Sequence, residues 1–170
     1  MLKLVGSSLI LTAAFGIAYR FHGELELQLK MLYGIRRMFV ELQQQMKLTL
    51  LPMEQILGEI KGDERLVEIC AQIAEELTVR QGEAPEEIWQ ESFLRQGRKL
   101  GITKEELQVA AEAGSAFFGK NLEENERKLA LYLEQMDFMI ETVRAKQKEK
   151  QRVYQTVSIL GGMMLIILLI

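Results

Sequence analysis

The chain has 170 residues, of which 48% are hydrophobic and 26% are charged, and its net charge is −3. This length provides for one modest hydrophobic core. The single cysteine, Cys70, excludes an intramolecular disulfide, and with a single histidine, His22, the chain has no Cys/His zinc cluster of the usual kind. Residues 53–142 hold twenty acids and ten bases, and this acidic surface disfavours nucleic acid as a partner.

The first expected element is an apolar segment at the N-terminus. No charge occurs between Lys3 and Arg20, and we expect residues 1–20 to form a transmembrane helix. Small side chains recur there at every fourth position, a spacing that lets membrane helices pack closely: Ser8, Thr12 and Gly16. A cleaved signal peptide is the alternative, because a basic start, an apolar middle and small residues near its end also fit one.

The sequence of residues 21–152 predicts a region that is helical throughout. An apolar stripe with steps of three and four residues follows Leu25 to Met46 and indicates one long helix. Three shorter helices then begin at a proline or a capping residue and end near a glycine. Their boundary residues are Pro52 and Gly62, Asp63 and Gly82, and Pro85 and Gly101.

Two further helices complete this region. Thr103 and Glu106 have the spacing of a capping box, which predicts a fifth helix from about residue 104 to 118. Asn121 and Glu124 repeat that spacing before a sixth, long helix. The expected fold is therefore all-α, a membrane-anchored six-helix bundle with long antiparallel first and last helices.

The last element is apolar again. Residues 153–170 carry no charge, and as a helix they would rise about 27 Å, close to the thickness of a bilayer core. We expect a second transmembrane helix, with a buried core helix as the alternative. Gly161 and Gly162 offer either a close helix-packing site or a flexible point. Five bases precede the segment, between Arg144 and Arg152, and they predict that residues 21–152 form a cytoplasmic bundle.

The sequence offers little for catalysis, and we expect no catalytic residue, cofactor or metal. His22 is expected at the membrane edge, Cys70 as a buried thiol and Trp89 as a partly buried side chain. Neighbouring acids diverge by about 100° around a helix and do not face a common ion. The acidic surface is either simply solvated or a docking patch. The candidates for such a patch are Glu83, Glu86, Glu87, Glu112, Glu123 and Glu124.

Three stretches resemble, in order and spacing, the helical cytoplasmic domain of the type II secretion F family, the inner-membrane platform proteins of secretion and pilus machines. They are FVELQQQMKLTLLPMEQILGEI, ELTVRQGEAPEEIWQESF and EELQVAAEAGSAFFGKNLEENERKLALYLEQ. Pro52 lies where that family has a Leu-Pro turn, and Glu112 and Gly114 remain from its Gly-Glu-x-Gly-x-Leu region. The length and the single domain are similar to the family's sporulation members in endospore-forming bacteria.

The resemblance implies a non-enzymatic scaffold in the mother-cell membrane, within the channel that joins mother cell and forespore. The implied partners are the cell membrane, a companion sporulation ATPase, other channel subunits and, because secretion platforms usually carry two such domains, a second copy of the chain. Two other hypotheses remain. One is a membrane-anchored adaptor or regulator that recruits soluble proteins through the bundle. The other is a small membrane enzyme that uses Glu112, Glu123 and Glu124.

Overall fold

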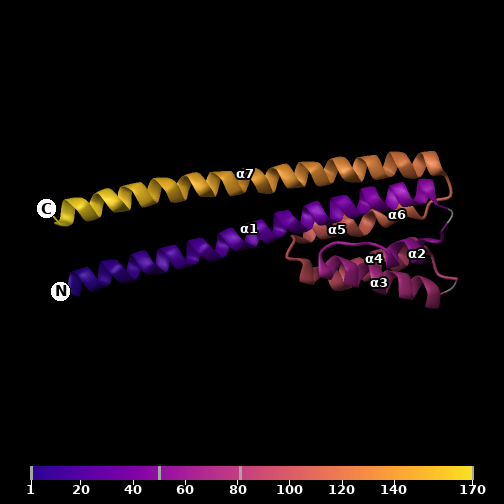
Figure 1. Cartoon of the computed structure of the whole chain (residues 1–170), viewed down its shortest axis with the longest axis horizontal. Coiled ribbons are helices and arrows are strands. Elements are labelled where there is room, and N and C mark those ends of the chain that lie inside the picture. The colour runs from indigo at the N-terminus through magenta and orange to yellow at the C-terminus, as the bar shows by residue number, and fades with distance from the viewer. Residues whose placement is uncertain (1, 50, 81, 170) are drawn as a thin grey trace. The chain divides into compact units, whose positions relative to one another are not determined.

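The computed structural model describes the backbone of residues 2–49, 51–80 and 82–169, and the side chains of residues 23–49, 51–80, 82–154, 156, 157, 160 and 161. No strand occurs in this described part, which confirms the all-α class. The elements in chain order are α1 (Leu2–Leu48), α2 (Met53–Gly58), α3 (Glu64–Val79), α4 (Pro85–Gln96), the 3-10 helix η1 (Gly97–Leu100), α5 (Lys104–Glu112), α6 (Gly114–Phe117) and α7 (Leu122–Leu169) (Figure 1).

The chain divides into two compact units. One contains Met1–Leu27 and Thr142–Ile170, and the other, which we call the bundle, is Gln28–Glu141. Among the described residues, we find no helix that is long and apolar enough to cross a membrane. The predicted span 1–20 and most of the predicted span 153–170 lie outside the described side chains, as do Ser8, Thr12, Gly16, His22 and Gly162. Gly161 is described, and a Cβ placed there would meet nothing within 4 Å.

Within the bundle, α1 and α7 lie side by side and antiparallel. Arg36 binds Asp137 through two parallel contacts, Nε to Oδ1 at 2.5 Å and Nη2 to Oδ2 at 2.9 Å. Lys47 Nζ lies 3.0 Å from Glu126 Oε1. The two pairs are eleven residues apart on each helix, in opposite directions, and eleven residues are about three helical turns. The predicted antiparallel pairing of the long helices is therefore confirmed for this part of the chain.

The core of the bundle is built around Trp89. This side chain is fully buried and contacts Phe93 and Phe117 at ring-centroid distances of 5.2 and 5.3 Å. Phe39 of α1 adds an edge contact to Phe117 at 5.6 Å. The expected partial burial of Trp89 was wrong, because the indole Nε1 has a buried acceptor, the carbonyl oxygen of Ala110 at 3.1 Å, and needs no water.

The fifth predicted helix, about 104–118, is divided in the structure. α5 ends at Glu112 and α6 begins at Gly114. The chain turns there against the indole ring, so closely that a Cβ on Gly114 would lie 2.5 Å from Trp89 Cδ1. The predicted count of six helices is corrected accordingly, since the described residues form seven α-helices and one 3-10 helix.

The predicted helix caps are present, one of them only in part. Asp63 Oδ1 accepts a hydrogen bond from the backbone of the first turn of α3. Both halves of the capping box formed by Thr103 and Glu106 are made, at 2.7 and 3.3 Å. Asn121 caps the start of α7, but within the described residues the Glu124 carboxylate contacts Lys128 and does not complete the box.

Candidate partner-binding surface

Most of the predicted acidic candidates lie at the N-termini of two helices. Glu86 and Glu87 occupy the first turn of α4, and Glu123 and Glu124 occupy the first turn of α7, where carboxylates face the positive end of the helix dipole. All four residues are exposed. Their positions therefore follow from the preference for carboxylates at the start of a helix.

Lys128 shows that these two helix starts are close together. Its Nζ lies 2.8 Å from Glu124 Oε1. The hydrogen bond to Glu124 is the main reason that the pKa of Lys128 is raised, and the nearby charge of Glu86 acts in the same direction. The first turns of α4 and α7 thus contribute to one surface.

Glu112 joins the same surface from α5. Ser115 Oγ donates to the carbonyl oxygen of Glu112 at 3.0 Å and lies 3.4 Å from the hydroxyl of Tyr132. Tyr132 is one turn beyond Lys128 on α7. The Glu112 carboxylate is exposed and accepts a hydrogen bond from Gln108 at 2.8 Å. We call the resulting surface the acidic rim, formed by Glu86, Glu87, Glu112, Glu123 and Glu124.

Glu83 precedes α4 and takes part in an ion-pair network. Its carboxylate pairs with Arg80 at the end of α3. Arg80 also binds Glu76 and Glu91, at 3.4 and 2.9 Å, so the network joins the end of α3 to α4. Of the six candidates, Glu83 is the one that the structure ties into the network around Arg80.

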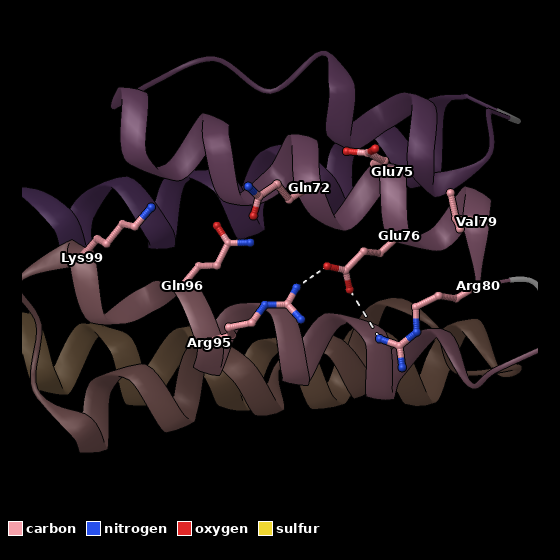
Figure 2. Close-up of a pocket in the computed structure, with 8 residues that line it drawn as sticks. All are labelled: Gln72, Glu75, Glu76, Val79, Arg80, Arg95, Gln96 and Lys99. Atoms are coloured by element: carbon pink, nitrogen blue, oxygen red, sulfur yellow. Dashed lines mark hydrogen bonds and ion pairs between the residues drawn. The ribbon is translucent and has the colours of Figure 1, made fainter.

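The network around Arg80 borders a groove between α3 and the α4–η1 segment, with a volume of about 680 Å³ (Figure 2). Glu76 accepts hydrogen bonds from Ser92 Oγ at 2.9 Å, from Arg95 and from Arg80. Burial raises the pKa of the Glu76 carboxyl, but these hydrogen bonds outweigh it and the net pKa is lowered. The carboxylate therefore stays ionised between two guanidinium groups. The residues that line the groove are Gln72, Glu75, Glu76, Val79, Arg80, Arg95, Gln96 and Lys99.

This groove was not predicted from the sequence. A signal was present, because Trp89, Phe93, Gln96 and Leu100 follow one another at steps of four, three and four. A glutamine at the third position of a buried stripe indicates a polar group that the fold holds inside. The structure shows that Gln96 is only 8% exposed.

No group of three metal-binding side chains that could hold an ion occurs among the described residues. Cys70 is buried, as expected, and its Sγ lies 3.3 Å from Met38 Sδ. Burial raises the pKa of its thiol to about 12. A thiol with this pKa is not a nucleophile at neutral pH.

The fold and its surfaces define an all-helical bundle protein with a charged rim and a charged groove. The chain belongs to the family of stage III sporulation protein AB, whose sequence profile matches residues 3–170. The family is one of sporulation proteins. Comparisons with curated proteins and with solved structures found no match. The expected likeness to the F-family fold therefore stays a prediction.

Proposed function

We propose that this protein is a non-enzymatic platform subunit of the channel between mother cell and forespore, and that its acidic rim docks a companion secretion-type ATPase. The observation that carries the proposal is membership of the sporulation family over residues 3–170. The described bundle supports it by presenting large charged surfaces on a well-packed core.

The charge of the rim favours a cationic partner surface. Glu86, Glu87 and Glu123 lie close to other acids, and their mutual repulsion is unfavourable in the free protein. A basic surface on the partner would relieve that repulsion and speed association. The net charge of −10 over residues 53–142 acts in the same direction.

Membrane attachment is the second part of the proposal. Residues 4–19 and 153–170 carry no charge, and the bases between Arg144 and Arg152 adjoin the second of these segments. Lys and Arg next to a span stay on the cytoplasmic side. The bundle would then face the mother-cell cytoplasm, where it can reach an ATPase.

Charge reversal on the full-length chain tests the docking surface. The variant Glu86→Lys/Glu123→Lys/Glu124→Lys is expected to lose co-purification with the sporulation ATPase from sporulating cells. The matched control reverses three exposed acids outside the rim, Glu59→Lys/Glu134→Lys/Glu141→Lys, and is expected to retain it. Equal retention by both variants, or ATP hydrolysis by the purified chain itself, would contradict the proposal.

Topology is tested with a reporter thiol. Val79 is 74% exposed, so Val79→Cys in a Cys70→Ser background gives one accessible cysteine. We expect a membrane-impermeant thiol reagent to label it only after the cells are permeabilised. Labelling in intact cells would place the bundle outside and exclude contact with a cytoplasmic ATPase.

An adaptor or regulator is the second candidate function, and the groove of Figure 2 favours it because a groove suits recruitment of a soluble protein. Deletion of the gene distinguishes the two functions. If the protein is a platform, we expect sporulation to be blocked completely after engulfment. If it is an adaptor, we expect a working channel with altered timing.

A further inference from the structure

We propose that a pocket between α1 and the loop that joins α2 to α3 binds a phosphate monoester, with Arg37 and Lys61 as its charged partners. The monoester is carried either by a free solute or by the headgroup of a lipid. The pocket shares no residue with the acidic rim or with the groove of Figure 2. The inference therefore does not rest on the proposed docking of an ATPase.

The pocket has a volume of about 220 Å³. Its lining comes from residues 30–38 of α1, from residues 60–63 and from the first turn of α3, and all of these residues belong to the bundle. Met38, Ile60 and Leu66 are buried and form the apolar part of the lining. The charged side chains of the lining are more exposed, so the pocket combines an apolar part with a charged opening.

Arg37 and Lys61 are the side chains that indicate an anion. Both line the pocket and are exposed, and neither makes a hydrogen bond or an ion pair with any of the described residues. Arg37 belongs to α1, whereas Lys61 belongs to the loop, so the fold brings two unpaired positive charges to one pocket. An anion bound between them would relieve their mutual repulsion.

The pocket contains a single acid, and its charge is already compensated. Asp63 Oδ1 lies 3.1 Å from Arg65 Nε, and Asp63 Oδ2 lies 3.1 Å from Lys30 Nζ. Because Arg65 can hold this carboxylate by itself, Lys30, whose side chain is 68% exposed, can turn to a ligand. Three bases and one acid give the lining a net charge of +2.

This charge favours a phosphate monoester over other anions. A monoester carries a charge of about −1.5 to −2 at pH 7 and three strong acceptor oxygens, whereas a carboxylate or a phosphodiester carries a single charge. The guanidinium of Arg37 can bind two phosphate oxygens at once, and the ammonium of Lys61 binds as a point charge. Tyr33 also lines the pocket and has a hydroxyl group that can donate. The apolar side chains can contact the carbon atoms of the ester.

Calorimetric titration of the full-length chain, purified in a non-ionic detergent, tests the proposal. The probes are glycerol phosphate, which is a soluble monoester, and two short-chain lipids, dihexanoyl phosphatidic acid, a monoester, and dihexanoyl phosphatidylglycerol, a diester. We expect a monoester to bind more tightly than the diester. Tighter binding of phosphatidic acid than of glycerol phosphate would indicate a lipid as the source, and the reverse order would indicate a free solute.

Substitutions in the pocket should change this affinity in both directions. We expect Arg37→Gln and Lys61→Gln each to weaken monoester binding about tenfold, the loss that corresponds to one hydrogen bond to a charged group. Asp63→Asn removes the acid of the lining and should tighten binding several-fold. A general loss of structure would not produce opposite changes. Thermal unfolding without ligand checks that each variant is folded.

The matched controls remove exposed bases that do not line the pocket. Arg98→Gln and Lys104→Gln are such variants, and both should leave the affinity unchanged. The proposal would be overturned if neither monoester binds, or if the diester binds as tightly as the monoesters. An equal loss of affinity in Arg98→Gln and Arg37→Gln would also overturn it, because binding would then reflect general charge attraction.

Discussion

At the scale of single residues, two helix-capping carboxylates also join their helices to α1. Asp63 caps α3 and lies 3.1 Å from Lys30 Nζ. Glu106 completes the capping box of α5 and accepts two hydrogen bonds from Gln28 Nε2, at 2.7 and 2.9 Å. Both partners lie on one turn of α1. A charged side chain that makes several hydrogen bonds in this way fixes a helix start and its position in the bundle together.

Asp63 makes the stability of the protein depend on pH. The hydrogen bond from Arg65 is the main reason that the pKa of Asp63 is lowered to about 2, against about 3.9 in an unfolded chain. Because the folded-state pKa is the lower one, the stabilisation is complete above about pH 5 and is lost as the pH falls through about 4 towards 2.

In Asp63→Asn the amide can still cap the helix but cannot ionise. We expect the free energy of unfolding of the wild type to fall by about 1 kcal/mol more than that of the variant between about pH 5 and pH 2, after allowance for solvent screening. Urea unfolding at each pH measures this difference. Glu59→Gln, at an exposed acid, is the control. Parallel pH profiles for Asp63→Asn and wild type would contradict the expectation.

Gly114 has a packing role. A Cβ at this position would lie 2.5 Å from Trp89 Cδ1 and 2.7 Å from Cγ, and the indole ring is enclosed by other aromatic rings. We expect Gly114→Ala to lower the free energy of unfolding by about 1–3 kcal/mol, the usual cost of overpacking. Gly58→Ala is the matched control, because nothing lies within 4 Å of its added Cβ. Thermal unfolding measures both variants, and equal stability of the two would argue against a packing role.

At the scale of elements, charged pairs set the register of α1 against α7. Apolar stripes alone hold two helices together but tolerate a shift by one turn, because each stripe repeats every three or four residues. Arg36 with Asp137, and Lys47 with Glu126, are both satisfied in only one register. The antiparallel pair is therefore fixed by charge as well as by burial.

A double-mutant cycle tests this role of Arg36. The variants Arg36→Gln, Asp137→Asn and the double variant are compared by urea unfolding. We expect a coupling energy of roughly 0.5–1 kcal/mol, at the upper end for exposed pairs because the contact is bidentate. The pair of Glu124 and Lys128, exposed and within one helix, serves as the control and should couple more weakly than Arg36 and Asp137. No measurable coupling between Arg36 and Asp137 would contradict the role in register.

At the scale of the whole molecule, the core of the bundle encloses the only thiol. Cys70 is 1% exposed and contacts Met38 of α1. Burial raises its pKa to about 12. A thiol reagent can then react only when the bundle opens, since the thiolate is the reactive form.

We expect Cys70 in the full-length chain to react with a thiol reagent at a rate set by unfolding of the bundle. The rate should rise with urea in parallel with the unfolding equilibrium measured by circular dichroism. Val79→Cys with Cys70→Ser, which carries an exposed thiol, should react at the rate of a free cysteine. Fast labelling of Cys70 in the native protein would show that the bundle opens locally around α3.

The sequence by itself determined the helical class and most helix boundaries. Proline, glycine and capping residues act through the local backbone, so Asp63, Thr103 and Gly101 can be interpreted without knowledge of the fold. The apolar stripes identified most buried positions for the same reason, because helix periodicity is local. The acidic candidates could be named but not grouped, since the distance between the starts of α4 and α7 depends on packing.

Only the tertiary structure decided how these parts meet. The full burial of Trp89, the break at Gly114 and the groove beside Gln96 depend on contacts between helices that are far apart in the sequence. Ion pairs between helices, the close approach of a backbone to a ring and the surroundings of a buried amide each involve two or more elements. No local sequence pattern encodes them. The ion-pair network of Arg80 with Glu76 and Glu91 has the same cause, because it joins α3 to α4.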